Sequence, residues 1–180
     1  MKILIAQASS KQMQKTFSLM KEKMEGKYQN FSQGVSQHIA QSISVEICGN
    51  KKLPITCADI RKSEADLFIN FDLAGFEQST LTDGIAYNLL DCKQIHILLR
   101  DKLPGERYLA KQLSISMFFY CADLKYCQYL QSKYPDMPYL KAIEGWKKNG
   151  QENREDSIEK NAEIFCDIVR EVLEICRMLP

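Results

Sequence analysis

Three acidic residues follow the most apolar stretch of the chain and have the side chains for catalysis. Asp72 ends the apolar run that begins at Asp66, and Glu77 and Asp83 come after it. Two carboxylates in one site can divide the work of a general acid and a general base. Asp72 and Glu77 are therefore the candidate catalytic residues. A structural role for Asp72 and a solvated Glu77 are the alternatives that the sequence leaves open.

Two glycines, Gly75 and Gly84, frame this acidic loop. Glycine lets the backbone come close to a ligand, so Gly75, Asp83 and Gly84 are candidate ligand-binding residues. Asp83 has an alternative role as the cap of the helix expected after it. The loop from Asp72 to Asp83 is the first place where we expect a site.

Two further loops follow apolar runs and carry polar side chains. Ser9 and Ser10 follow the run at residues 2–7, and backbone amides at the start of the next helix can receive an anion. The glycine-rich phosphate fingerprint is absent there, so a plain connecting turn is the alternative. Arg100 follows the run at residues 94–99, where it can pair with a phosphate or carboxylate or remain solvated.

These loops need a scaffold that brings the ends of several strands together. Apolar runs alternate with amphipathic helical patterns along the chain, as expected of strands buried on both faces of a parallel sheet. Carboxyl ends of parallel strands meet at one edge of the sheet, where ligands bind. The pattern predicts one α/β domain over residues 1–180, a Rossmann-like sandwich. Its mainly parallel sheet should have about five or six strands, with helices on both faces.

The expected elements have the following bounds. Strands are expected at residues 2–7, 43–48, 66–73, 94–99, 114–121 and 139–143. Helices are expected at residues 11–23, 29–42, 57–64, 107–113 and 122–133, with another that starts near Thr82 or Asp83 and a long one at the carboxyl terminus. Residues 146–156 are polar and charged, which predicts an exposed connection to that last helix.

Composition argues against several classes of function. Lys and Arg together number 24 and Asp and Glu number 23, which gives a net charge of +1. This charge does not indicate electrostatic binding to nucleic acid or to an anionic membrane. No stretch approaches the ~20 apolar residues of a membrane span. We expect a small-molecule ligand, with no nucleic acid partner and no membrane span.

The seven cysteines predict reduced, structural thiols. Their number is odd, no CxxC pair occurs and the two histidines stand alone, so neither a disulfide framework nor a zinc site is indicated. Reduced thiols are typical of cytoplasmic proteins. We therefore expect a cytoplasmic protein without a metal ion or another cofactor.

The order of features from Asp66 to Trp146 resembles the amino-terminal half of bacterial glycosyltransferases of the two-domain GT-B type. The segments that carry the resemblance are DLFINFDLAGF, TDGIAYNLLDCKQIHILL, FFYCADLKYCQYLQSKYP and YLKAIEGW. In such enzymes a second Rossmann-like half binds the nucleotide-sugar donor, and this sequence has no room for it. The resemblance implies an acceptor-like half domain that binds a sugar or nucleotide-sugar related ligand, alone in another role or with a partner chain.

A shorter stretch, ADLFINFDLAGFEQSTLTDGIAYNLLDCKQIHILL, is similar to the core of nucleoside deoxyribosyltransferases and related nucleotide N-glycosidases. This resemblance implies that Asp72 takes the place of the family's aspartate after the strand, and it puts Asn88 where the nucleophilic Glu is expected. An amide cannot form the covalent sugar intermediate that a carboxylate forms. The second hypothesis is therefore a deoxyribosyltransferase-like nucleoside or nucleotide enzyme or its inactive relative, with Asn88 as a ligand-binding residue. A non-catalytic binding module is the third hypothesis.

Aromatic residues near the expected strand ends suggest a contact with another chain. Phe76, Tyr139 and Trp146 are expected to form an exposed cluster where a second domain would close. Exposed apolar patches commonly mark partner surfaces. We therefore expect self-association or a partner chain docked over that face.

Overall fold

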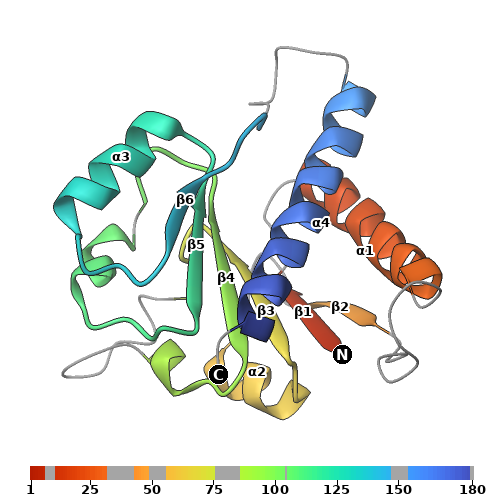
Figure 1. The fold of residues 1–180 in the computed structure, drawn as a ribbon, viewed down its shortest axis with the longest axis horizontal. Coiled ribbons are helices and arrows are strands. Elements are labelled where there is room, and N and C mark those ends of the chain that lie inside the picture. The colour runs from red at the N-terminus through yellow and green to blue at the C-terminus, as the bar shows by residue number, and fades with distance from the viewer. Residues whose placement is uncertain are drawn as a thin grey trace.

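The computed structural model describes residues 1–6, 11–31, 43–48, 56–75, 86–103, 105–146 and 154–178. It contains a six-stranded sheet with the order β2-β1-β3-β4-β5-β6, and every neighbouring pair is parallel (Figure 1). The strands are β1 (Lys2–Ala6), β2 (Ser44–Cys48), β3 (Leu67–Phe71), β4 (Lys93–Leu98), β5 (Met117–Cys121) and β6 (Leu140–Ala142). The predicted Rossmann-like α/β fold is confirmed.

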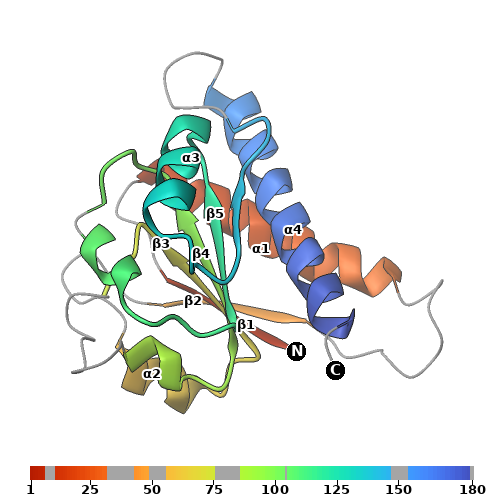
Figure 2. The ribbon, with the colours of Figure 1, turned by 60° about the vertical axis from the view of Figure 1, so that its left-hand side comes forward.

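Helices cover both faces of the sheet, as predicted. The helices α1 (Lys11–Phe31) and α4 (Arg154–Met178) lie on one face. The other face carries α2 (Cys57–Ser63), the 3-10 helices η2 (Ala86–Leu89) and η3 (Glu106–Ala110), and α3 (Leu124–Lys133). The two views in Figures 1 and 2 show α3 on the side opposite to α1 and α4.

Complete burial explains why the central strands are almost wholly apolar. All five residues of β3 and all five of β5 are buried, because side chains on both faces of these strands meet helices. On the α1 and α4 face, Phe17 and Phe165 are almost fully buried and their rings lie near Phe71 of β3. Each such side chain contributes about 1.5–3 kcal/mol through burial.

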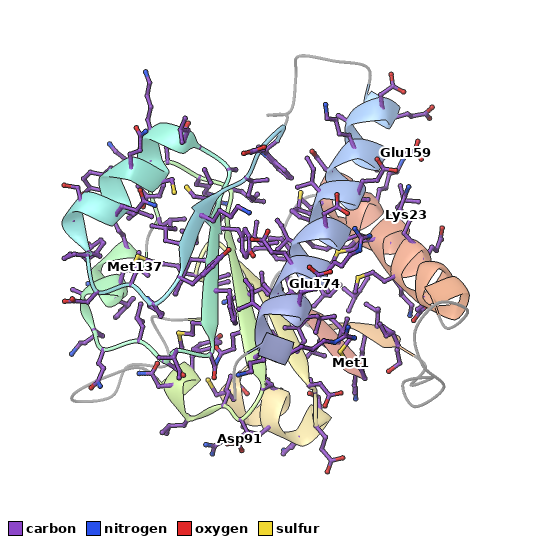
Figure 3. The ribbon with its side chains drawn as sticks, viewed as in Figure 1. Met1, Lys23, Asp91, Met137, Glu159 and Glu174 are labelled. Carbon is purple, nitrogen blue, oxygen red and sulfur yellow. The ribbon has the colours of Figure 1, made fainter. Side chains whose placement is uncertain are left out.

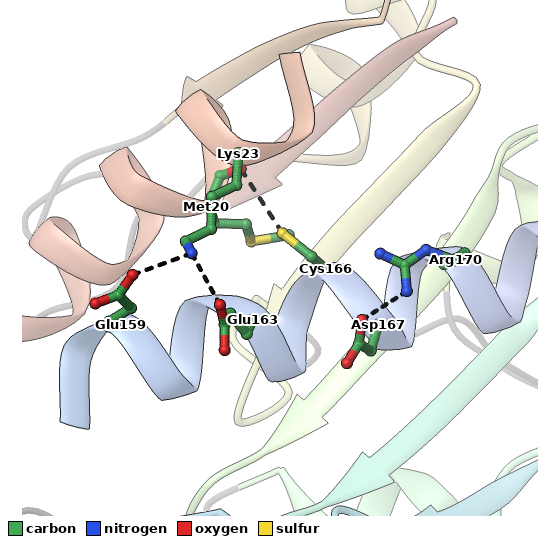
Figure 4. A network of polar contacts seen from close by, with 7 residues as sticks. All are labelled: Met20, Lys23, Glu159, Glu163, Cys166, Asp167 and Arg170. Atoms are coloured by element: carbon green, nitrogen blue, oxygen red, sulfur yellow. Dashed lines mark hydrogen bonds and ion pairs between the residues drawn. The ribbon is translucent and has the colours of Figure 1, made fainter. Parts of the chain in front are cut away.

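Polar contacts join α1 to α4 at the rim of this apolar layer. Lys23 Nζ of α1 lies 3.4 Å from Glu159 Oε1 and 3.0 Å from Glu163 Oε1 of α4 (Figure 4). Both carboxylates are exposed, so these ion pairs add little stability. The apolar side chains that α1 and α4 bury against each other and against the sheet supply most of the stabilisation.

Both outer strands have one backbone group bound by a side chain from a helix. The amide of Val45 in β2 donates to Glu25 Oε1 of α1 at 3.1 Å. On the opposite edge of the sheet, Gln131 Nε2 of α3 donates to the carbonyl oxygen of Leu140 in β6 at 3.4 Å. These two bonds occupy positions that a further strand would need for pairing.

The side of β1 on which successive strands are added changes after β2, while all strands stay parallel. From β1 the chain passes to β2 on one side, and from β3 it proceeds through β4 and β5 to β6 on the other. In open parallel sheets ligands bind beyond the carboxyl ends of the strands at such a switch point. The turn after β3 therefore occupies the position where this fold favours a site.

Several helix bounds differ from the expected ones. The helix α1 extends to Phe31, while residues 32–42 of the expected second helix lie outside the described residues. The expected helix 107–113 is the 3-10 helix η3, and only η2 is described of the helix expected before β4. The helix α4 begins at Arg154, inside the expected connection 146–156. Hydrophobic periodicity locates a helix better than it locates its ends.

Two negative findings concern the described part of the chain. None of its helices combines the length and the apolar character that a membrane crossing requires. All seven cysteines are described, and all are free thiols, four of them buried.

Candidate functional site

The turn after β3 has an unusual backbone. Asp72 and Leu73 have φ values of 49° and 56°, and Gly75 has a φ of 82°. Two successive non-glycine residues in the left-handed region are strained, although Asp tolerates it better than Leu. Such strain persists only where surrounding contacts hold it, and it concentrates at functional sites.

The Asp72 carboxylate ties this turn to the end of the next strand. Its Oδ1 accepts hydrogen bonds from the amides of Leu99 at 2.7 Å and Arg100 at 3.3 Å, just after β4. Its Oδ2 lies 3.2 Å from Nε of Arg100. One carboxylate therefore holds the carboxyl ends of β3 and β4 together.

Buried polar groups hold the same turn from inside the domain. The carbonyl oxygen of Ala74 accepts hydrogen bonds from Asn70 Nδ2 at 3.0 Å and from the hydroxyl of Tyr87 at 3.1 Å. Leu73 is buried, and a Cβ added at Gly105 would lie 3.2 Å from the Cβ of Leu73. The loop after β4 thus closes against the turn through a glycine.

Sequence reasoning missed the supporting residues of this turn. Asn70 is fully buried in the apolar run of β3, and Tyr87 is fully buried in η2. A lone Asn inside such a run was the available signal, because buried amides require partners. Its partner, a carbonyl four residues along, depends on the left-handed turn and could not be read from the pattern.

Burial is the main influence on the acidity of Asp72. It raises the pKa of the carboxyl, while the Leu99 amide, the Arg100 charge and the Arg100 amide act in the opposite direction without cancelling it. A carboxylate with these partners has little freedom to move toward a substrate. The geometry indicates a positioning role, and its catalytic role stays a prediction.

Arg100 is the exposed member of its ion pair with Asp72. Its side chain is 59% exposed, against 20% for Asp72. Nε faces Asp72, and the two terminal nitrogens have no acceptor among the described residues. A guanidinium held at one side and open at the other can bind a carboxylate or a phosphate.

Asn88 lies away from this site. Its Nδ2 donates to the carbonyl oxygen of Gln112 at 2.6 Å, and its Oδ1 accepts from the amide of Ser114 at 3.0 Å, shortly before β5 begins. These contacts belong to the amino ends of the strands, where Figure 3 labels Asp91 at the lower side of the molecule. The structure therefore does not bring Asn88 and Asp72 together.

The remaining predicted site residues are not described. Asp72, Gly75, Asn88 and Arg100 are described, and the first two lie in the turn after β3. The others, Ser9, Ser10, Glu77, Asp83 and Gly84, lie outside the described residues. Their roles stay predictions.

A second polar cluster, which the sequence did not indicate, surrounds Glu106. Its carboxylate accepts hydrogen bonds from the hydroxyls of Tyr126 at 2.6 Å, Tyr129 at 3.1 Å and Tyr134 at 3.3 Å. Lys133 Nζ donates to it at 2.8 Å. Burial opposes ionisation of Glu106, but these hydrogen bonds outweigh it and lower its pKa. The cluster joins η3 to α3.

The exposed aromatic cluster expected around Tyr139 and Trp146 is not observed. Trp146 is half-buried with its ring 5.4 Å from that of Phe165, and Tyr139 is half-buried with its hydroxyl donating to Glu171 at 2.8 Å. Both rings belong to the apolar layer under α4 because the helix lies directly on them. Phe76 lies outside the described residues.

Neither a histidine base nor a metal centre is available in the described part of the chain. His96 is fully buried in β4, and burial lowers its pKa to about 3, which keeps it neutral. No group of three or more His, Cys, Asp or Glu side chains is placed to hold a metal ion among the described residues. The chemistry that the described part of this edge supports is recognition of a polar or anionic ligand.

No protein-family model, no curated protein and no solved structure matches this chain.

Proposed function

We propose that this protein binds a sugar or nucleotide-sugar related ligand at the carboxyl edge of its sheet, as a GT-B-like half domain. The observation that carries the proposal is the left-handed turn at Asp72 and Leu73, beside the switch point. Strained turns at this location in parallel sheets commonly serve ligands.

The support around the turn favours binding. The side chains of Asn70 and Tyr87 donate hydrogen bonds to the turn, and the Asp72 side chain accepts one from the end of the neighbouring strand. A preorganised backbone lowers the cost of ordering a ligand site. Hydrogen bonds therefore fix the backbone at the carboxyl edge of the sheet. A backbone fixed in this way is expected of a surface that recognises a ligand.

The chain alone is not expected to transfer a glycosyl group. In a two-domain enzyme much of the rate arises from orienting two substrates across the domains. Here the carboxylate at the strand end is engaged by two amides and Arg100. The proposed role is recognition, with any transfer dependent on a separate donor-binding chain.

A ligand panel tests this proposal. Purified protein is screened by thermal shift against nucleotides, nucleotide sugars, nucleosides and free sugars, because a ligand that binds the folded state raises the melting temperature. Hits are then mapped by amide chemical shifts. Shifts concentrated at Leu73, Gly75 and Leu99 would support the proposal. No binding at millimolar concentrations, or shifts elsewhere in the domain, would overturn it.

A further inference from the structure

We propose that Arg100 binds a phosphate group of the ligand and that Asp72 positions its guanidinium. The ligand class is then phosphorylated, such as a nucleoside diphosphate or a nucleotide sugar. This inference rests on the proposed function. It adds that the ligand carries a negatively charged phosphate and that Arg100 binds it.

The accessible side of Arg100 is the first step. Its Nε lies 3.2 Å from Asp72 Oδ2, while its terminal nitrogens have no acceptor in the described part of the protein. Three other arginines differ, because Arg61, Arg107 and Arg170 each donate through a terminal nitrogen. Among the described residues, the terminal nitrogens of Arg100 therefore have no partner that competes for them, and together they form the fork of donors that fits phosphate oxygens.

The hold on Arg100 is the second step. Asp72 Oδ1 accepts a hydrogen bond from the Arg100 amide at 3.3 Å, and Asp72 Oδ2 forms an ion pair with Arg100 Nε at 3.2 Å, so one carboxylate contacts both the backbone and the guanidinium of Arg100. The same carboxylate accepts from Leu99 at 2.7 Å and sits in the strained turn. An arginine held at both places loses less freedom when a ligand arrives.

The charge balance is the third step. Asp72 neutralises one side of the guanidinium, and at 20% exposure it is the less accessible partner of a pair whose arginine is 59% exposed. An anion that approaches from solvent therefore meets the guanidinium more readily than the carboxylate. The pair presents positive charge outward without leaving an isolated charge.

Calorimetric titration of matched probes tests the inference. The probes are uridine diphosphate and adenosine diphosphate, their nucleosides and inorganic pyrophosphate. The variants are Arg100→Gln, Arg100→Lys and Asp72→Asn, with Arg61→Gln as the control because it removes an equivalent exposed charge at the amino ends of the strands. Melting curves of each variant establish that it is folded.

A phosphate contact predicts a specific pattern. Arg100→Gln should weaken a diphosphate about tenfold or more and leave its nucleoside unchanged, and Arg100→Lys should recover part of the loss through its charge. Arg61→Gln should change neither. Asp72→Asn should weaken the diphosphate several-fold, and this loss should disappear in the Arg100→Gln background, which a merely structural role would not produce.

Contrary outcomes separate the two proposals. If nucleosides or sugars bind at this edge and diphosphates gain nothing from their phosphates, the inference fails and the proposed function stands. The same holds if diphosphates bind Arg100→Gln as well as wild type. If neither these probes nor the sugars and nucleotide sugars of the wider panel bind the wild-type protein, both proposals fall.

Discussion

Asp72 and Glu106 are carboxylates in the segments that follow the neighbouring strands β3 and β4. Each is paired with a basic side chain, and their pKa values are shifted in opposite directions. The pKa of Asp72 is raised and that of Glu106 is lowered. Burial is the largest single influence in both cases. Glu106 overcomes it with hydrogen bonds from Lys133 and the tyrosine hydroxyls, and Asp72 does not.

This difference separates a structural anchor from a candidate site. Every partner of Glu106 stabilises its ionised form, and these hydrogen bonds join η3 to α3. Asp72 is held in a left-handed backbone with incomplete compensation, beside an exposed arginine. A carboxylate whose ionised form is only partly compensated, in a strained turn, is the better candidate for function.

The largest expected effect comes from removing the Asp72 side chain. Asp72→Ala should lower the free energy of unfolding by about 3 kcal/mol, because it leaves the amides of Leu99 and Arg100 without this acceptor and puts Ala in a left-handed conformation. Asp72→Asn keeps an acceptor and tolerates that conformation, so about 1 kcal/mol is expected. Urea unfolding measures both. Equal stability of Asp72→Ala and wild type would mean that the carboxylate does not hold the turn.

Glu106 should produce the next largest effect. Glu106→Gln should cost about 2 kcal/mol in urea unfolding, because Lys133 and the tyrosines lose an ionised acceptor. Tyr126→Phe should cost more than Tyr134→Phe, since their hydroxyls lie 2.6 and 3.3 Å from the carboxylate. Ligand binding should be unchanged in all three variants. A loss of binding would move the site toward η3.

The pH dependence of stability should have opposite signs at the two carboxylates. The pKa of Asp72 is raised in the folded state. Its contribution to the free energy of unfolding is therefore fully present below its ordinary pKa of 3.8 and is lost as pH rises through the higher folded-state pKa. The lowered pKa of Glu106 gives a contribution present above 4.5 and lost as pH falls through the folded value.

Unfolding of wild type, Asp72→Asn and Glu106→Gln across this acidic range tests those signs. The advantage of wild type over Asp72→Asn should shrink as pH rises, while its advantage over Glu106→Gln should grow. If the stability advantage of wild type over the two variants changed in the same direction with pH, the two carboxylates would not differ in the way described.

Asn88 is expected to have little effect on ligand binding. Asn88→Ala removes the bonds to Gln112 and Ser114 and should cost about 1 kcal/mol of stability. Affinity for any ligand found in the panel should stay within about twofold of wild type, because the residue lies at the other ends of the strands. A large loss of affinity would restore the position implied by the deoxyribosyltransferase resemblance.

Apolar runs made the sheet predictable, and the same runs located Asp72 and Arg100 at strand ends. The partners of Asp72 were not predictable, because the Leu99 amide is 27 residues away and is met only through strand pairing.

Asn88 shows a different limit. A connection in a parallel sheet returns from the carboxyl ends to the amino ends, so a residue shortly before β4 lies at the amino ends, whatever helix contains it.

The side-chain bonds on the two outer strands affect how this protein behaves when crowded. Glu25 and Gln131 already occupy a backbone group at the outer edge of β2 and of β6. A free strand edge is a template on which identical chains add to one another and finally precipitate. The domain should therefore tolerate high concentration during expression, and Glu25→Ala, which exposes the Val45 amide, should be more prone to aggregate than wild type.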